Sequence, residues 1–361
     1  MKILIAGGGT GGHLFPGIAL AESFLEKDPA NRVQFVSTRR AVDQEVLKSR
    51  GFSALTIEAE GVKGQGLFRQ LHSLLKIPGA LRQSLEIIRN FKPQLVIGVG
   101  GYISGPVVLS AWLKRVPTAI QEQNSIPGLT NRLLARVVDR IFLAFERSRN
   151  FFPGRKCRLT GNPVRKELRR ALETPRETAA PLNILILGGS QGAHRVNQLI
   201  VESLRFLAPL KRNLFFIHQT GTKDEDWVKQ AYLDQGFNQQ VSAFIHDMAQ
   251  AYGRADMLVC RAGAMTLAEI TALGKASLLI PFPFAANNHQ EENARALVQA
   301  GAAEMIREAD LSAEALGKRI RFWVENPRYR EQLAARALRL GRWQAAEEIV
   351  ESCYRLVEQT L

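Results

Sequence analysis

A strand followed by a glycine loop occurs twice in this chain, and the duplication constrains the fold more than any other feature. Residues 2–13 hold a short apolar run and then the loop Gly-Gly-Gly-Thr-Gly-Gly-His, and residues 183–194 repeat this order in register. Such a run predicts a buried parallel strand, and the helical pattern after the first loop predicts a helix that begins there. A repeat of this length indicates two similar α/β units, each with its glycine loop at the end of the first strand.

Strands and helices alternate along both halves. We predict further strands at residues 33–37, 95–99, 117–121, 214–218, 241–245, 257–260 and 276–281, and helices at 106–113, 129–137, 328–340 and 343–361. This alternation predicts two facing doubly wound parallel sheets of the Rossmann-like α/β class with an interdomain cleft. The polar, proline-punctuated stretch 173–181 predicts a connection between them.

Composition narrows the range of partners. The net charge of +14 and the pI near 10.0 favour a polyanion: nucleic acid, an anionic membrane or a phosphate-bearing substrate. No nucleic-acid-binding motif is present, so nucleic acid is the weakest of the three. The three cysteines form no C-x-x-C pair, which fits a reducing compartment and predicts neither a disulfide framework nor a zinc site. No apolar run approaches the length of a membrane span.

Several side chains follow the predicted strands and could carry chemistry. His13 ends the first glycine loop and is the best candidate for a general base, with His194 in the second loop as its rival. Glu269 lies about a turn into the helix after strand 257–260, where a carboxylate can hold ribose hydroxyls; the alternative is a solvated helix residue. Asp224 and Asp226 have the D-x-D spacing of a metal site, but acidic residues at a helix start are expected anyway, so we predict no metal.

A dinucleotide site is the first alternative, because Gly7-x-Gly9-x-x-Gly12 fits the fingerprint of such sites. The strand at 33–37 runs into Thr38-Arg39-Arg40 without the acidic residue that would hold a ribose, although arginines could accept NADP. A second glycine loop is not expected in one cofactor fold joined to a separate catalytic domain, so the repeat disfavours a dehydrogenase.

Residues 64–92 combine apolar and basic side chains. An apolar face beside cations suits an element that lies on anionic lipid, and a pair of helices covering a sheet is the alternative. The predicted membrane contacts are Leu67, Phe68, Arg69, Leu71, Leu74, Leu75, Lys76 and Arg82.

The motifs at residues 7–13, 100–106, 122–124, 161–165, 188–192 and 261–266 together resemble those of the bacterial N-acetylglucosaminyltransferases that make lipid II of peptidoglycan. These are family 28 type members of the GT-B glycosyltransferases. The resemblance implies an acceptor domain at 1–163, a donor domain at 164–340 and a helix at 341–361 that packs back on the first domain. It implies inverting transfer of GlcNAc from UDP-GlcNAc to the C4 hydroxyl of the MurNAc-pentapeptide of lipid I, without cofactor, at the cytoplasmic face of the inner membrane.

The resemblance also assigns roles to single residues. His13 would be the general base. The donor contacts would be Thr10, Gly11, Gly12, Asn124, Arg165, Ser190, Ile245, Ala264, Met265, Thr266, Leu267, Ala268, Glu269 and Gln290. The acceptor side would be formed by Gly9, Tyr102, Ser104 and Glu122. Partners would be lipid I, the anionic membrane surface and other cell-wall and division proteins, and no nucleic acid.

Three positions depart from the pattern of the family. Gln121 stands where many members have histidine, His194 stands where arginine is common, and the segment before Gln290 varies in length. Two alternatives stay open beside the dehydrogenase: another GT-B glycolipid synthase that uses a UDP-sugar, and a protein that binds lipid intermediates without turning them over.

Overall fold

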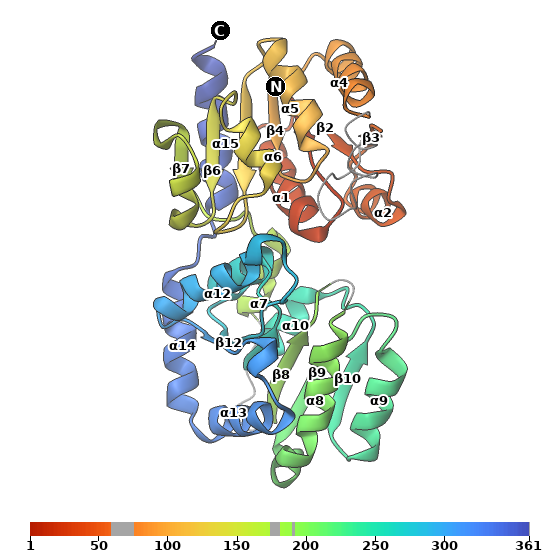
Figure 1. Ribbon diagram of the computed structural model, residues 1–361, viewed down its shortest axis with the longest axis vertical. Helices are drawn as coiled ribbons and strands as arrows, with labels where there is room; N and C mark the ends of the chain where they lie inside the picture. Colours follow the sequence, from red (N-terminus) through yellow and green to blue (C-terminus); the bar gives the residue numbers. More distant parts are fainter. Residues whose placement is uncertain (59–75, 174–180, 190–191, 361) are drawn as a thin grey trace. The chain divides into compact units, whose positions relative to one another are not determined.

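The chain folds into two compact units. The computed structural model describes residues 1–58, 76–173, 181–189 and 192–360. The first unit comprises Met1–Arg165 with Arg342–Leu361, and the second comprises Lys166–Gly341. Each unit is a parallel sheet with helices on its faces (Figure 1).

The sheet of the first unit has the order β3-β2-β1-β4-β5-β6-β7, and every neighbouring pair is parallel. Its strands are β1 Lys2–Ala6, β2 Arg32–Ser37, β3 Ala54–Thr56, β4 Leu95–Gly98, β5 Thr118–Glu122, β6 Arg140–Leu143 and β7 Cys157–Leu159. Residues 3–6 of β1 and all of β4 are apolar and buried because helices cover both faces of the sheet. The strand order reverses between β1 and β4, which opens a crevice at their carboxyl ends where ligands bind in such sheets.

Alternate residues of β1 divide the core of this unit in two. Ile3 and Ile5 face α1 and α15, whereas Leu4 and Ala6 face the layer of α4, α5 and α6. The helices are α1 Gly11–Lys27, α2 Ala41–Ser49, α4 Ile77–Phe91, α5 Ser104–Leu113, α6 Leu129–Leu134 and α15 Ala345–Glu358, with short 3-10 turns at Glu146–Phe151 and Gly154–Lys156. The last helix therefore completes the first unit, and Tyr354 on it accepts a hydrogen bond from Asn31 at 2.8 Å.

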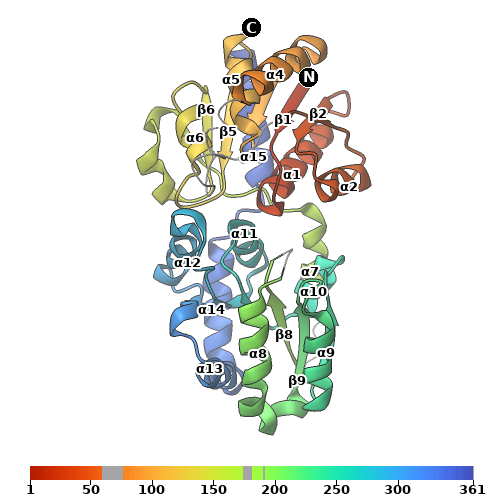
Figure 2. The ribbon, with the colours of Figure 1, turned by 45° about the vertical axis from the view of Figure 1, so that its right-hand side comes forward.

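The second unit repeats the plan with the strand order β10-β9-β8-β11-β12-β13, again all parallel. Its strands are β8 Leu182–Leu187, β9 Leu214–Gln219, β10 Asn238–Ser242, β11 Met257–Cys260, β12 Ala276–Leu279 and β13 Glu304–Met305. Its helices are α7 Arg170–Glu173, α8 His194–Leu207, α9 Glu225–Asp234, α10 Met248–Arg254, α11 Ala264–Leu273, α12 His289–Gln299, α13 Ala313–Glu325 and α14 Pro327–Arg339. Helices α8 and α9 lie side by side on the face that carries Ile184 and Ile186 (Figure 2).

Most predicted strands form, but one was misplaced. The strand predicted at 241–245 lies at Asn238–Ser242, so Ile245 belongs to the loop that follows it. Helix α4 has Pro78 in its first turn, where proline is tolerated, and its buried row is Ala80, Ser84 and Ile88. Among the described residues, no helix combines the length and hydrophobicity needed to cross a bilayer.

A buried polar chain runs through the core of the second unit. Asn197 donates through Nδ2 to the Thr220 carbonyl at 2.9 Å and to Asp224 at 2.7 Å. Its Oδ1 must therefore accept, and it lies 3.0 Å from Nε2 of His218, whose Nδ1 is 3.1 Å from the Tyr232 hydroxyl. Burial lowers the pKa of His218 to about 3, against a smaller raising effect of Asp224. His218 is consequently neutral in the folded protein.

This neutral histidine predicts loss of stability in weak acid. The pKa of His218 is lower in the folded protein than in the unfolded chain, where it is near 6.5. Its contribution to the free energy of unfolding is therefore complete above pH 6.5 and is lost as the pH falls toward the folded pKa. We expect the free energy of unfolding to drop by about 2 kcal/mol between pH 7 and pH 5 from this group alone. Urea unfolding of His218→Gln should show a shallower pH dependence than wild type, whereas the exposed-site variant His246→Gln should keep the wild-type slope. Equal slopes for all three proteins would refute the role of His218.

Candidate active site

The first glycine loop is held in shape by a carboxylate. Asp43 is buried, and one of its oxygens accepts from the Gly9 N–H at 2.7 Å and from the Thr38 hydroxyl at 2.6 Å. The Gly9 carbonyl accepts from Arg40. Both polar backbone groups of Gly9 are therefore engaged within the protein. The N–H groups that precede the hydrogen-bond ladder of α1 are those of Gly11 and Gly12.

His13 lies in the first turn of α1, and its ring packs against a second glycine loop. A Cβ on Gly100, whose φ is +96°, would stand 2.6 Å from Cδ2 of His13 and 3.0 Å from its Nε2. Nδ1 of His13 is 3.1 Å from the hydroxyl of Thr10, the residue that precedes the helix. The ring is thus positioned by the end of β1 on one side and by the end of β4 on the other.

Ser104 stabilises the glycine loop after β4 through its hydroxyl rather than contacting a ligand. It is fully buried, and its hydroxyl accepts from the Gly100 N–H at 3.1 Å and lies 2.7 Å from the Ala6 carbonyl and 2.8 Å from the Gly100 carbonyl. Its polar atom is consumed by the backbone of the loop. The predicted acceptor-side role of Ser104 can therefore be only indirect.

Glu122 organises the loop after β5. Its buried carboxylate accepts from the Asn124 N–H at 2.9 Å, from the Gly128 N–H at 3.2 Å and from Nδ2 of Asn131 at 2.9 Å. Burial raises its pKa, and these hydrogen bonds oppose the shift. Gln121 is buried and donates to Asn162 at 2.7 Å. Both residues hold loops and position Asn124 at the carboxyl edge of the sheet.

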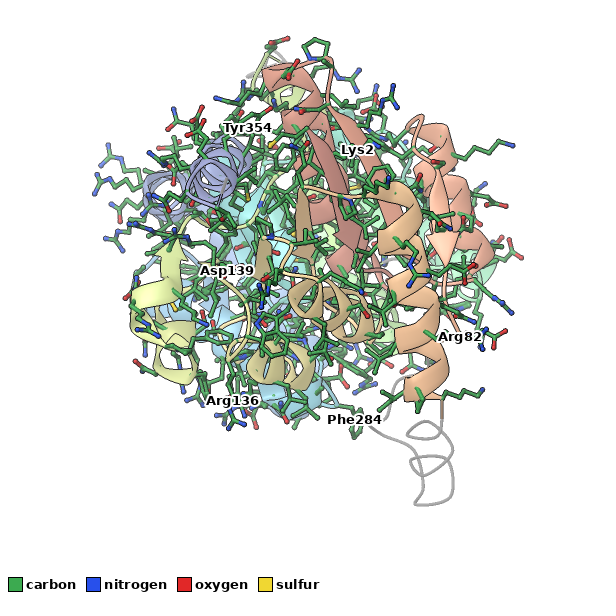
Figure 3. The ribbon with its side chains drawn as sticks, turned by 90° about the horizontal axis from the view of Figure 1, so that it is seen from above. Lys2, Arg82, Arg136, Asp139, Phe284 and Tyr354 are labelled. Carbon is green, nitrogen blue, oxygen red and sulfur yellow. The ribbon has the colours of Figure 1, made fainter. Side chains whose placement is uncertain are left out.

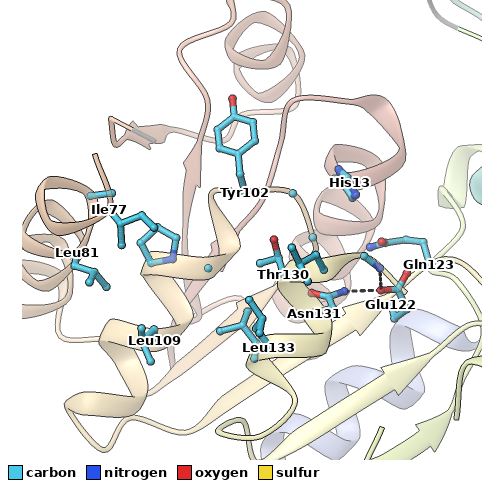
Figure 4. A pocket seen from close by; sticks show the side chains of 18 of the residues that line it. His13, Ile77, Leu81, Tyr102, Leu109, Glu122, Gln123, Thr130, Asn131 and Leu133 are labelled. Atoms are coloured by element: carbon cyan, nitrogen blue, oxygen red, sulfur yellow. Dashed lines mark hydrogen bonds between the residues drawn. The ribbon is translucent and has the colours of Figure 1, made fainter. Parts of the chain in front are cut away.

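A cavity of about 550 Å³ opens at this edge of the first unit (Figure 4). His13, Tyr102 and the loop after β5 form its polar side, and aliphatic side chains from three helices form the rest. Its lining residues are His13, Lys76, Ile77, Ala80, Leu81, Gly100, Gly101, Tyr102, Gly105, Pro106, Leu109, Glu122, Gln123, Asn124, Gly128, Leu129, Thr130, Asn131, Leu133 and Leu134. The predicted base His13 and two of the four predicted acceptor-side residues, Tyr102 and Glu122, thus line one cavity.

Arg165 is the last residue of the first unit and is mostly buried. Its guanidinium lies 4.7 Å from the centre of the Phe15 ring on α1. A guanidinium stacked on an aromatic ring keeps its fork of N–H donors while losing mobility. Arg165 is therefore held close to α1, with a guanidinium suited to binding a diphosphate.

In the second unit, α11 begins directly after β11 and the turn at Gly263. Its first residues are Ala264, Met265 and Thr266, small or unbranched enough to leave the N-terminus open to an anion. Arg261 braces this turn, because it donates to the carbonyls of Ile280 and Pro281 and pairs with Glu308 at 2.5 Å. The turn after β11 and the loop after β12 are therefore held together.

Glu269 is buried, which excludes the solvated alternative. One oxygen accepts from the Tyr252 hydroxyl at 2.8 Å, so α10 holds the carboxylate in place on α11. Met265 and Leu267 are buried beside it, while Thr266 and Ala268 are not fully covered. A carboxylate fixed in this way is suited to bidentate hydrogen bonding of two ribose hydroxyls.

Two further residues predicted to contact the sugar donor already use one of their polar groups in hydrogen bonds within the protein. The Ile245 N–H donates to Gln219 at 2.9 Å, which leaves its carbonyl for a base. Oε1 of Gln290 accepts from the Phe282 N–H at 2.9 Å, which leaves its amide N–H₂ for a sugar hydroxyl. Ser190 lies outside the described residues. His194, the first residue of α8, lies with its Nδ1 2.9 Å from Oδ1 of Asp224.

The predicted membrane segment is described only in part. Lys76 and Arg82 are on or next to α4, and Arg82 points outward from that helix (Figure 3). The remaining predicted contacts lie outside the described residues; they are Leu67, Phe68, Arg69, Leu71, Leu74 and Leu75.

Sequence reasoning missed the residues that support the site. Asp43 is an acidic residue that follows β2. The sequence analysis considered only the residues directly after that strand and therefore overlooked it. Gln219 and Tyr252 carry no motif and meet Ile245 and Glu269 only through the fold.

Comparisons with known proteins agree with this arrangement. Residues 3–143 match the glycosyltransferase family 28 N-terminal domain, and residues 183–349 match the glycosyltransferase family 28 C-terminal domain. A protein of Syntrophus aciditrophicus is 49% identical over 99% of this chain and 99% of its own, and one of Myxococcus xanthus is 48% identical over 100% and 94%. Both carry the name UDP-N-acetylglucosamine--N-acetylmuramyl-(pentapeptide) pyrophosphoryl-undecaprenol N-acetylglucosamine transferase.

Solved structures point the same way. The crystal structure of Acinetobacter baumannii MurG aligns with a TM-score of 0.78 at 30% identity, over 98% of this chain and 99% of that one. A UDP-GlcNAc 2-epimerase of Neisseria meningitidis aligns with a TM-score of 0.71 at 18% identity, over 98% and 100%, a likeness of fold alone. The predicted GT-B fold and the predicted resemblance are both confirmed, and the dehydrogenase alternative is set aside. The chain belongs to glycosyltransferase family 28.

Proposed function

We propose that this enzyme transfers GlcNAc from UDP-GlcNAc to the C4 hydroxyl of the MurNAc-pentapeptide of lipid I and so forms lipid II. The observation that carries the proposal is a cavity with an imidazole at one end and aliphatic walls at the other. A lipid-linked sugar needs both environments in one site. Full-length relatives at 49% identity that carry the corresponding name support the same choice.

The second unit supplies the donor site in this proposal. Glu269 binds the ribose hydroxyls, the Ile245 carbonyl accepts from the uracil N–H, and the amide of Gln290 binds the GlcNAc hydroxyls. The N-terminus of α11 faces the diphosphate, and Ser190 is also assigned to it by the family pattern. Donors and a helix dipole aimed at a leaving diphosphate stabilise the charge that develops as its bond to the sugar breaks.

His13 acts as the general base on the acceptor. The C4 oxygen attacks the anomeric carbon of GlcNAc, the bond from that carbon to the diphosphate breaks, and UDP leaves with the electron pair. The acceptor proton passes to Nε2 of His13, which holds a lone pair when Nδ1–H donates to the Thr10 hydroxyl. A single displacement of this kind inverts the anomeric configuration.

Release of UDP in a panel of donors and acceptors tests this function. We expect UDP-GlcNAc with a soluble lipid I analogue to give rapid release, and UDP-glucose or diacylglycerol to give little. Rapid turnover of diacylglycerol would favour another glycolipid synthase. Binding of lipid I without UDP release would favour the protein that binds lipid intermediates without catalysis.

The proposed location is the cytoplasmic face of the inner membrane, bound peripherally, where other cell-wall and division proteins would be neighbours. The net charge of +14 and the basic residues along α4 support attraction to anionic lipid.

Charge reversal on α4 tests this location. Each basic residue near an anionic surface contributes about 1 kcal/mol, so Arg82→Glu with Arg89→Glu should lower partition into anionic vesicles at least about thirtyfold. The matched control is Arg212→Glu with Lys229→Glu, which changes net charge equally on exposed sites of the second unit. Equal loss in both variants would mean that overall charge, rather than α4, governs binding.

A further inference from the structure

The loop between β12 and α12 ends in an unusual helix start. Asn287 and Asn288 both have a φ of +55°, and Asn288 is the residue that precedes α12. Of the described non-glycine residues with positive φ, these two alone are neighbours; the others, Lys92 and Arg115, follow helix ends, where this conformation is common. Two left-handed residues in succession persist only where their surroundings impose them, often at functional sites.

A carboxylate on α12 supplies this constraint. In most helices the side chain of the preceding residue accepts from a backbone N–H of the first turn, but Asn288 makes no such bond. Its Nδ2 instead donates to Oε2 of the buried Glu291 at 2.8 Å. The side chain of Asn288 is therefore held by Glu291 rather than by the backbone of the helix.

Two arginines hold Glu291 in turn. Its Oε1 accepts from Arg295 at 2.6 Å, one turn further along α12, and from Nε and Nη2 of Arg307 at 2.9 and 2.7 Å. The hydrogen bonds from Asn288, Arg307 and Arg295 lower the pKa of Glu291 to about 2, so the carboxylate is ionised at neutral pH. Both of its oxygens accept within the protein, as expected of a residue that fixes a loop.

Arg307 also connects this helix start with the other loops at the carboxyl edge of the sheet. It follows β13, and its neighbour Glu308 pairs with Arg261 in the turn after β11. Arg261 donates in addition to the carbonyls of Ile280 and Pro281, which follow β12. The short segment after β13 therefore anchors the turn after β11 and both ends of the loop before α12.

Gln290 lies within the held segment, between Asn288 and Glu291. Its Oε1 accepts from the Phe282 N–H at 2.9 Å, which leaves its amide N–H₂ for a ligand. In the proposed function this group binds the GlcNAc of the donor. Because the backbone at Asn288 sets the direction in which α12 begins, rotation of that residue out of the left-handed region would redirect the amide of Gln290.

We propose that Glu291 is a positioning residue for the sugar of the nucleotide donor. Held by Arg295 and Arg307, it keeps Asn288 in the left-handed conformation and so directs the amide of Gln290 at the sugar. The inference rests on the proposed function and adds the residues that set the geometry of sugar binding. The proposed contacts of the nucleoside come from α11 and from the loop after β10, so this network acts on the sugar and not on UDP.

Comparison of the donor with UDP tests this separation. Glu291→Ala and Asn288→Ala should each raise KM for UDP-GlcNAc about fivefold, because a hydrogen bond to the sugar is misdirected. The competitive inhibition constant of UDP, which carries no sugar, should change by less than about twofold. Asn288→Gly should raise KM less than Asn288→Ala does, because glycine adopts the left-handed conformation without a side chain to hold it there.

The matched control is Glu314→Ala, which removes the pair of Glu314 with Lys318 at 2.6 Å on α13, a helix that supplies none of the proposed donor contacts. It should keep both wild-type constants. A wild-type KM in Glu291→Ala would overturn the proposal, and so would an equal rise of KM for UDP-GlcNAc and of the inhibition constant of UDP. Equal impairment of Asn288→Gly and Asn288→Ala would overturn the role of the left-handed conformation. No transfer from UDP-GlcNAc by wild type would instead count against the proposed function.

Discussion

We expect His13→Ala to release UDP from UDP-GlcNAc and a lipid I analogue roughly two to four orders of magnitude more slowly than wild type. The variant removes the group that accepts the proton while leaving the glycine loop in place, because Asp43 holds that loop through Gly9 and Thr38. The loss should appear in kcat rather than in KM for the donor, since the side chains proposed to hold the ribose and the GlcNAc, Glu269 and Gln290, belong to the second unit.

His194→Ala is the control that separates the two histidines. His194 is engaged by Asp224 at 2.9 Å in the second unit, and the cavity lining contains His13 but not His194. We expect its replacement to change kcat by less than about threefold. Full activity in His13→Ala together with a large loss in His194→Ala would reverse the assignment of the base.

The strands that sequence placed well are those buried on both faces. The runs at 3–6, 184–187 and 257–260 are apolar throughout because helices cover both sides of each sheet. The strand β10 was misplaced for the opposite reason. It lies at the edge of its sheet, pairs only with β9, and reads Asn-Gln-Gln-Val-Ser with no fully buried residue. Because hydrophobicity was the criterion, the strand was predicted at the next apolar stretch along the chain.

The candidate site divides in the same way. Glycine loops and His13 stand in contiguous motifs, so sequence could place them at the carboxyl ends of strands. The groups that hold these residues come from distant parts of the chain: Tyr252 reaches Glu269, and Gln219 reaches Ile245. Sequence also cannot tell whether a polar side chain faces a ligand or its own backbone. Ser104 stands in a motif of the family, yet its hydroxyl is spent on Gly100 and Ala6.

Gly100→Ala should disable the enzyme without touching any residue that reacts. The φ of +96° at Gly100 is unfavourable for alanine, and the new Cβ would stand 2.6 Å from Cδ2 of His13. We expect a stability loss of about 1–3 kcal/mol from the backbone strain. Displacing the base by about 1 Å should lower kcat by roughly a hundredfold.

Gly105→Ala is the matched control, since Gly105 also lines the cavity and lies in α5. Its Cβ would meet Thr130 at 3.5 Å, an ordinary contact, and alanine is favoured over glycine within a helix. We expect its kcat and melting temperature to match or exceed those of wild type. If Gly100→Ala were equally active, the ring of His13 could move without cost, and the close packing of the two glycine loops would not be what positions the base. A selective loss in Gly100→Ala would mean that the backbone of the β4 loop sets the position of the imidazole.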